Sequence, residues 1–267
     1  MNNSERFTNR VAYYVKYRPS YPEAYLGYLA TEVGFKENSV VADIGAGTGI
    51  LSKLLARRVK RVFAVEPNHQ MRLAAQEYCK DAGNVAVVNG CAEATTLPDA
   101  SVDFITAAQA FHWFKIDEAR KEFSRILRPG GKTALVWNVR DISTPFGKEY
   151  EKIVKQFCLD YIGSGGGSSE TLAYRMFFKG GKYDYRAFPN DRRIDLETLL
   201  GYSLSTSYAP NRGDENYNDF IQSLKDIFAR YAIDGTVLLS TITQSYVGEI
   251  EPSPSSGQAP DRLFPSF

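Results

Sequence analysis

The stretch VVADIGAGTGI, residues Val40 to Ile50, decides the fold class of this chain. An apolar run ends in Asp43, three glycines follow at alternate positions, and the sequence ILSKLLARRV after them has the pattern of a helix. An apolar strand that enters a glycine turn and then a helix is typical of the first unit of an open α/β sheet. Glycines suit this turn because they let a ligand approach the backbone closely and accept backbone angles that a Cβ would penalise.

The spacing of these glycines separates two classes of cofactor. Gly45, Gly47 and Gly49 follow the pattern G-x-G-x-G, and Ile50 stands where the dinucleotide fingerprint G-x-G-x-x-G has its last glycine. The chain also has no evident Tyr/Lys signature for hydride transfer. A nicotinamide-dependent oxidoreductase is therefore an alternative rather than the first prediction. A catalytically inactive scaffold that only binds a cofactor is a second alternative.

Composition narrows the class of protein. The chain has 267 residues, of which 43% are hydrophobic and 24% charged, as in ordinary globular proteins. Its net charge of +1 favours neither nucleic acid nor a membrane as a partner. The N-terminus lacks the apolar core of a signal peptide, and no apolar run approaches the ~20 residues that span a bilayer. Three cysteines without a C-x-x-C pattern predict neither a disulfide framework nor a metal site. We expect a cytoplasmic protein.

Strand and helix patterns alternate over residues 39–139, as in a parallel doubly wound sheet. Asn68 fits the N-cap of one helix, and the sequence RPGG, ending at Gly131, fits the end of another. The predicted strands are 40–44, 61–66, 85–90, 102–108 and 132–139, and the predicted helices lie around 51–58, 68–79 and 117–127.

Beyond residue 140 the pattern is less regular. It predicts helices over 145–159 and 216–232 and a single late strand over 236–247. Residues 163–169, GSGGGSS, predict a flexible loop, and the aromatic-rich segment 174–188 predicts a mobile cap. The Pro/Ser-rich tail, residues 251–267, is expected to be irregular.

Distinctive residues follow four of the predicted strands. The glycine turn follows the first strand and Glu66 ends the second. The run NGCAEATTLP, residues 89–98, follows the third, and AAQAFHWF, residues 107–114, follows the fourth. Ligands of open α/β sheets bind outside the carboxyl ends of the strands, so these segments are expected to converge on one nucleoside-like ligand. The Glu66 carboxylate can accept two hydrogen bonds from a ribose diol.

These motifs, in this order and spacing, resemble the class I S-adenosylmethionine-dependent methyltransferases of the small-molecule group called type 11. The resemblance covers residues 5–140 and is carried by DIGAGTG, VFAVEPNHQM, GCAEATTLPDASVDFITAAQAFHWF and RILRPGG. The opening RFTNRVAYYVKYRPSYP is similar to the N-terminal segment of trans-aconitate methyltransferase-like members. The resemblance implies a Rossmann-like methyltransferase fold with a doubly wound, mostly parallel seven-stranded sheet and a helical, aromatic lid insertion.

The resemblance also implies a domain organisation. It places an N-terminal lid segment at 1–38 and the cofactor-binding core at 39–140. A lid insertion with the final helix and strands follows at 141–250, and the tail at 251–267 ends the chain. The expected state is a monomer or a weak homodimer.

The resemblance assigns roles to residues that match the family's motifs. Asp43 would organise the amino group of the cofactor's methionine part, and Glu66 would hold the ribose hydroxyls. Arg18 would pair with the cofactor carboxylate or with an acidic substrate. The substrate pocket would contain Tyr17, His112, Trp113 and Trp137. The full set of expected S-adenosylmethionine-binding residues is Tyr14, Arg18, Asp43, Gly45, Ala46, Gly47, Gly49, Glu66, Pro67, Met71, Ala92, Glu93, Gln109 and Ala110.

The implied reaction needs little covalent help from the protein. A sulfonium is a good leaving group, so in-line positioning of acceptor, methyl carbon and sulfur can supply much of the acceleration. A general base is needed only where the acceptor atom carries a proton, and His112 is the candidate base. An orienting or packing role for His112 beside Trp113 is the alternative. The acceptor is expected to be a small molecule with a carboxylate or hydroxyl oxygen.

Overall fold

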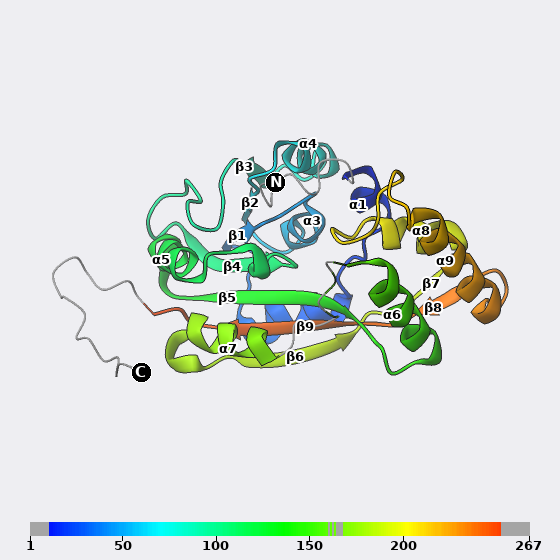
Figure 1. Ribbon diagram of the computed structural model, residues 1–267. Coiled ribbons are helices and arrows are strands. Elements are labelled where there is room, and N and C mark those ends of the chain that lie inside the picture. The colour runs from blue at the N-terminus through cyan, green and yellow to red at the C-terminus, as the bar shows by residue number, and fades with distance from the viewer. Residues whose placement is uncertain (1–10, 160, 162, 164–167, 252–267) are drawn as a thin grey trace.

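The centre of the molecule is a seven-stranded sheet, as the computed structural model of residues 11–159, 161, 163 and 168–251 shows (Figure 1). The strand order is β3-β2-β1-β4-β5-β9-β6, and β9 runs antiparallel to both of its neighbours while the first five strands pair in parallel. This confirms the predicted fold class. The strands of this sheet are β1 (Val40–Ile44), β2 (Arg61–Val65), β3 (Val85–Val88), β4 (Val102–Ala108), β5 (Leu127–Arg140), β6 (Asp184–Pro189) and β9 (Thr241–Gly248).

Helices cover both faces of the sheet, which explains why β1 is an almost unbroken apolar run. One face packs against α2 (Glu23–Tyr28), η2 (Leu29–Val33) and α3 (Ile50–Ala56). The other packs against α5 (Ile116–Ile126) and α7 (Ser168–Phe177). Helix α4, residues His69–Tyr78, follows β2 and begins at the predicted N-cap, where the Asn68 side chain accepts a hydrogen bond from the Met71 N–H.

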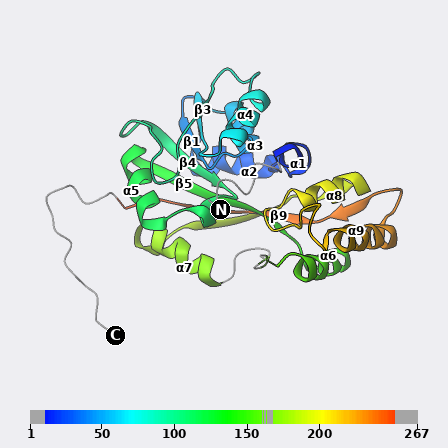
Figure 2. The ribbon, with the colours of Figure 1, turned by 45° about the horizontal axis from the view of Figure 1, so that its top comes forward.

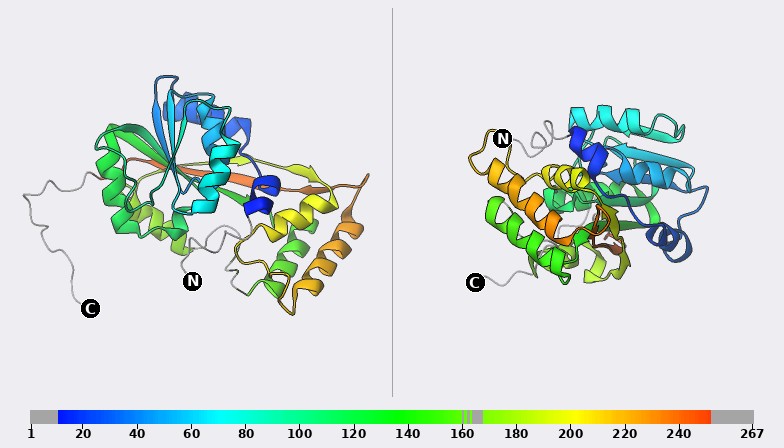
Figure 3. Two further views of the ribbon diagram at one scale, coloured as in Figure 1. Left: turned by 90° about the horizontal axis from the view of Figure 1, so that it is seen from above. Right: turned by 90° about the vertical axis from the view of Figure 1, so that its right-hand side faces the viewer.

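A second hydrophobic core lies beyond one end of the main sheet (Figure 3). It is centred on Tyr150, Leu199 and Leu224, all of which are almost fully buried. We call this part of the molecule the accessory unit. Its elements are α6 (Pro145–Phe157), β7 (Arg192–Ile194), α8 (Leu196–Leu204), α9 (Tyr217–Tyr231) and β8 (Val237–Leu239), with β7 and β8 forming a two-stranded sheet.

Helix α1, Val11–Tyr17, joins the two parts of the molecule. It lies between α4 and α8 and packs against both (Figure 2). The rest of the N-terminal region, α2 and η2, packs against the main sheet instead. Within residues 11–38, α1 and the residues just after it, rather than α2 and η2, are therefore placed to cover the carboxyl ends of the strands.

Two predictions for the second half of the chain are wrong. The single strand predicted over 236–247 is two strands in different sheets, β8 and β9, separated at Ser240, whose carbonyl accepts a hydrogen bond from Asp141 N–H. The predicted mobile cap over 174–188 is the end of α7 followed by strand β6. Its aromatic residues Tyr174 and Phe177 are buried in the main core rather than held over a ligand.

The structure also refines the helix and loop boundaries. The RPGG sequence lies inside β5, at an irregularity in its pairing with β4, so the strand begins five residues earlier than the predicted 132. Residues 168 and 169 of the predicted loop belong to α7, while 164–167 and the tail from 252 lie outside the described residues. Among the described helices, none has the length and apolar character needed to cross a bilayer.

Candidate active site

The loops that follow β1 to β4 surround a cavity of about 320 Å³ at the carboxyl edge of the main sheet. Helix α1 adds Tyr14 to its wall. Eleven of the residues expected at the site therefore meet in one place. The cavity is lined by Tyr14, Gly45, Gly47, Glu66, Pro67, Asn68, Met71, Cys91, Ala92, Glu93, Ala108, Gln109, Ala110, Trp113 and Phe114.

The glycine turn forms one wall of the cavity, and a side chain at Gly45 would not fit there. Gly45 has a φ of +69°, and a Cβ on it would lie 2.6 Å from Ala110 Cβ. Gly47 has a φ of +57° and also lines the cavity. Gly49 does not line it: a Cβ there would lie 2.8 Å from Cys79 Sγ. Gly49 therefore serves the packing of α3 against α4. The glycine motif alone does not distinguish this structural role from contact with a ligand.

Glu66 ties the ends of two strands together. Its Oε2 accepts a hydrogen bond from Gly47 N–H at 2.8 Å, and its Oε1 accepts one from Asn68 N–H at 2.9 Å. Burial raises the pKa of Glu66 above its ordinary value, and the two backbone hydrogen bonds act in the opposite direction. Each carboxylate oxygen keeps a second lone pair, so Glu66 can still accept hydrogen bonds from a ligand in the cavity.

Asp43 lies behind the cavity rather than in its wall. It is buried, and its two carboxylate oxygens accept hydrogen bonds from Ser52 Oγ at 2.6 Å and Thr106 Oγ1 at 2.8 Å. These bonds join β1 to α3 and to β4. Asp43 therefore holds the glycine turn in place, and any effect on a ligand is transmitted through that turn.

Burial of Asp43 makes folding stability depend on pH. Desolvation raises its pKa from 3.8 to about 6, because burial disfavours the charged form more than its hydrogen bonds favour it. The folded state thus binds this proton more tightly, so the contribution of Asp43 favours folding below its unfolded pKa and is lost as the pH rises through about 6. Between pH 4 and pH 7, the wild type should lose on the order of 2 kcal/mol of unfolding free energy through Asp43, and Asp43→Asn should not lose it. Urea unfolding at both pH values measures this loss, and a difference between the two proteins that is independent of pH would contradict it.

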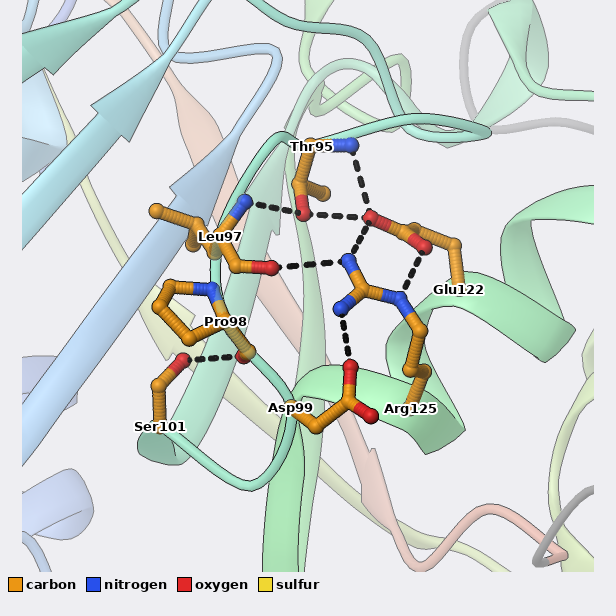
Figure 4. A network of polar contacts seen from close by, with 7 residues as sticks. All are labelled: Thr95, Leu97, Pro98, Asp99, Ser101, Glu122 and Arg125. Carbon is orange, nitrogen blue, oxygen red and sulfur yellow. Dashed lines mark hydrogen bonds and ion pairs between the residues drawn. The ribbon is translucent and has the colours of Figure 1, made fainter.

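A hydrogen-bond network holds the loop after β3, which contains Ala92 and Glu93. Glu122 on α5 accepts hydrogen bonds from Thr95 N–H and Oγ1, at 2.8 and 2.5 Å (Figure 4). Arg125 pairs with Glu122 and donates to the Leu97 carbonyl. Sequence reasoning missed this support because Glu122 and Arg125 lie in an ordinary amphipathic helix. Glu93 accepts a hydrogen bond from Lys115 N–H at 2.8 Å, so part of its carboxylate is already engaged.

The aromatic residues after β4 and on β5 form a cluster of tilted rings at one side of the cavity. The His112 ring centroid lies 4.5 Å from that of Trp113 and 5.1 Å from that of Trp137. Trp113 lines the cavity, whereas His112 and Trp137 do not. Although His112 keeps an exposed edge, desolvation by its neighbours lowers its pKa to about 4, and the charge of Arg18 adds to this effect. His112 is therefore neutral at physiological pH and a weak base.

A smaller cavity of about 30 Å³ adjoins the first under α1 and α8. It shares Gly45 and Gln109 with the larger one, and the expected site residues Ala46 and Arg18 line it. Asn138 and Tyr202 also line this cavity and, unlike the cofactor residues named above, neither was predicted at the substrate or cofactor site. The sequence held a signal for Asn138, which follows the apolar run of the fifth predicted strand, but none for Tyr202.

Tyr17 lines neither cavity and instead fastens α1 to α8. Its hydroxyl donates to Glu197 Oε1 at 2.8 Å, as does Lys16 Nζ at 2.7 Å. A Cβ on Gly201 would lie 2.2 Å from the Tyr17 ring, so this close contact needs glycine. The expected role of Tyr17 in the substrate pocket is thus replaced by docking of the helix that bears Tyr14.

No group of three or more His, Cys, Asp and Glu side chains among the described residues could hold a metal ion. The cavity combines a carboxylate, a stretch of backbone that a ligand can approach closely, and apolar walls. This combination suits a nucleoside, which has both polar and apolar parts.

Comparisons with known proteins point to one family. A family model described as a methyltransferase domain matches residues 42–135. An uncharacterised methyltransferase-like protein of Schizosaccharomyces pombe is 32% identical over 254 residues, which cover 92% of this chain and 96% of that protein. An uncharacterised methyltransferase of Mycobacterium bovis is 37% identical over 148 residues, which cover 55% of this chain and 58% of that protein.

Solved structures share the fold. A candidate type II methyltransferase from Anaeromyxobacter dehalogenans superposes with a TM-score of 0.64 at 24% identity, over 88% of this chain and 99% of that one. An S-adenosylmethionine-dependent methyltransferase from Geobacter sulfurreducens, in complex with S-adenosyl-L-homocysteine, gives a TM-score of 0.52 at 17% identity. That match covers 91% of this chain and 97% of the other.

Proposed function

Because this chain belongs to the class I S-adenosylmethionine-dependent methyltransferases, we propose that it methylates an oxygen atom of a small-molecule acceptor by in-line transfer. One observation supports the placement of the cofactor: the glycine turn, Glu66 and the loop after β3 line the same cavity. Membership of the family also removes the alternative of a nicotinamide-dependent oxidoreductase.

The residues present fit S-adenosylmethionine. Glu66 would hold the ribose hydroxyls through its remaining lone pairs. Gly45 and Gly47 would let the methionine part pass close to the backbone, since a Cβ at Gly45 would meet the opposite wall. Met71 and Ala92, both buried, would face the adenine. When bound, this cofactor supplies a methyl group activated by a sulfonium.

The kind of acceptor atom depends on whether the site has a side chain that could remove a proton from it. His112 is neutral and weakly basic, and Glu66 and Asp43 are engaged in hydrogen bonds. A carboxylate oxygen needs no base because it carries no proton, whereas a hydroxyl would need one. These observations favour a carboxylate oxygen over a hydroxyl as the methyl acceptor.

The test is transfer of label from methyl-tritiated S-adenosylmethionine to a panel of carboxylic acids and phenols, with release of S-adenosylhomocysteine as a second readout. We expect labelled methyl esters from one or more of the acids. Binding of S-adenosylhomocysteine without transfer to any acceptor would support the inactive-scaffold alternative. Preferential labelling of phenols would contradict the assignment of a carboxylate.

We propose that His112 orients the acceptor through its cluster of aromatic rings with Trp113 and Trp137. We expect His112→Ala to lower kcat at least ~10-fold, because misplacement of reacting groups is costly, while affinity for S-adenosylhomocysteine stays near normal. His112→Phe keeps an aromatic ring between Trp113 and Trp137 and should recover most of the loss. Steady-state kinetics and calorimetry measure both effects. Unchanged turnover in His112→Ala would remove this residue from the site, and failure of His112→Phe to recover would indicate an essential imidazole nitrogen.

A further inference from the structure

Gln109 holds a backbone conformation that side chains disfavour, at the place where the two cavities meet. Its φ is +58°, in the left-handed region that favours glycine. It directly follows β4 and lines both the larger and the smaller cavity. Strained residues persist only where the surrounding structure holds them, and they cluster at functional sites. A glycine would avoid this strain, so the side chain found here instead is a candidate functional group.

Strand β5 holds Gln109 by both its main chain and its side chain. The Gln109 N–H donates to the Val136 carbonyl at 2.9 Å, directly after the last paired residue of β4. The side chain reaches the same strand, where Nε2 donates to the Asn138 carbonyl at 3.1 Å. Both acceptors are backbone atoms of a strand that lies between β4 and β9 in the sheet. The amide group is therefore held in one position at the cavity wall.

The amide of Gln109 has one engaged end and one unused end. A backbone carbonyl can only accept, so the NH2 group faces Asn138 and Oε1 faces away from it. No described residue donates a hydrogen bond to this Oε1, and the atom is not sealed in the core. The Asn138 side chain, by contrast, is engaged at both ends. Its Oδ1 accepts hydrogen bonds from Thr243 and Asn190, and its Nδ2 donates to the Ser20 carbonyl.

The chemistry of this free oxygen limits the group that could bind it. A glutamine carbonyl oxygen accepts hydrogen bonds and has no titratable proton, so it pairs with a neutral donor and cannot serve as a general base. The smaller cavity, of about 30 Å³, has room for a group of roughly the size of one water molecule. A hydroxyl group meets both conditions.

We propose that Gln109 is a specificity-determining residue whose Oε1 accepts a hydrogen bond from a hydroxyl group of the methyl acceptor. The proposal rests on the proposed function, which makes the acceptor a small molecule methylated on a carboxylate oxygen. The hydroxyl is then a recognition group and not the methylated atom, because Gln109 cannot remove its proton. The acceptor class is thus a hydroxy acid whose hydroxyl lies at the wall that the two cavities share.

The direct test compares acids that differ by one hydroxyl group. Lactate and propionate form one pair, and mandelate and phenylacetate form an aromatic pair. Each acid is titrated into the protein saturated with S-adenosylhomocysteine and followed by calorimetry. We expect the wild type to bind the hydroxy acid of at least one pair ~5-fold or more tightly than its partner, as one hydrogen bond provides. Gln109→Met keeps the length of the side chain without the oxygen, and should bind both acids of that pair within ~2-fold of each other.

Gln222→Met is the matched control. Gln222 is exposed on α9, and its Nε2 donates to Asp226 Oδ1 at 2.8 Å. Its replacement therefore also removes an amide with one hydrogen bond, but at a residue that lines neither cavity. Gln222→Met should keep the hydroxyl preference of the wild type, since surface substitutions have small effects.

A second experiment measures the strain and needs no acceptor. Gln109→Gly and Gln109→Ala both lose the amide, but only glycine relieves the left-handed conformation. We expect the glycine variant to unfold about 2 to 4 °C above the alanine variant in thermal unfolding. At ordinary positions glycine is the less stable of the two. That ordinary order would show that Gln109 is not strained, and would remove the reason for assigning its side chain a function.

The outcomes separate this proposal from the proposed function. A hydroxyl preference that Gln109→Met loses, with no methyl transfer to any acid, would support the role of Gln109 and contradict the function. A preference that Gln109→Met retains or that Gln222→Met also loses, or no binding of any of the four acids, would overturn the role of Gln109 whatever the turnover. An equal loss of S-adenosylhomocysteine affinity in Gln109→Met would assign the amide to the cofactor and also overturn it.

Discussion

Replacement of Glu66 by alanine is expected to lower the affinity for S-adenosylhomocysteine at least ~100-fold, because two hydrogen bonds to a charged acceptor are lost. The carboxylate also accepts hydrogen bonds from Gly47 and Asn68, so its removal loosens both loops that border the ribose position. Isothermal titration calorimetry measures the affinity. Turnover at saturating acceptor should fall with it, since cofactor occupancy becomes limiting.

Two companion variants make this result interpretable. Glu66→Gln keeps the shape and one acceptor oxygen, so its loss should be smaller than that of the alanine variant. Glu77→Ala removes an exposed carboxylate near the end of α4, where it pairs with Lys80, and should bind S-adenosylhomocysteine as the wild type does. Binding by Glu66→Ala within a few fold of the wild type would remove Glu66 from the ribose site.

Gly45→Ala is expected to abolish measurable cofactor binding and to destabilise the fold. Its Cβ would lie 2.6 Å from Ala110 Cβ, and both residues line the cavity, so the two walls must separate. The φ of +69° adds strain for any residue with a side chain. Together, overpacking and backbone strain should cost about 2 to 5 kcal/mol of folding free energy. Urea unfolding and calorimetry measure the two effects separately.

Other glycines separate the causes of this loss. Gly47→Ala has a similar strain at φ +57°, but its nearest neighbour would be Tyr14 Cε1 at 3.8 Å, an ordinary contact. It should therefore be less damaging than Gly45→Ala. Gly83→Ala meets no atom within 4 Å and should leave binding unchanged. If Gly45→Ala bound S-adenosylhomocysteine as well as Gly83→Ala does, the proposed path of the methionine part along this turn would be wrong.

The sequence of residues 40–139 predicts its own structure well because the signals there are local. Apolar runs form parallel strands buried on both faces, and glycine turns follow them. Crossover connections then bring the carboxyl ends to one edge, which is why the sequence alone places Gly45, Glu66, Ala92 and Gln109 together. The motif does not distinguish a residue that contacts the ligand from one that supports the glycine turn. Asp43 and Gly49 were therefore expected at the ligand, but neither lines the cavity.

The sequence predicts two helices of the accessory unit, over 145–159 and 216–232, which correspond to α6 and α9, but it does not predict α8 or β7. Tyr202 lies on α8, a helix whose predominantly apolar sequence has no sharp polar face to mark it, and its neighbour Arg18 comes from a distant part of the chain. The boundary at Ser240 was hidden inside one continuous strand-like pattern. The glycine motif therefore predicts the methyl donor and gives no information about the acceptor.

We propose that this cavity binds S-adenosylmethionine through Glu66. Calorimetric titration of S-adenosylhomocysteine and of NAD into the wild-type chain and Glu66→Ala tests it most directly. We predict that S-adenosylhomocysteine binds the wild type at one site per chain, that Glu66→Ala loses this binding, and that NAD binds neither. Binding of NAD alone, or equal affinity of the wild type and Glu66→Ala for S-adenosylhomocysteine, would contradict the claim.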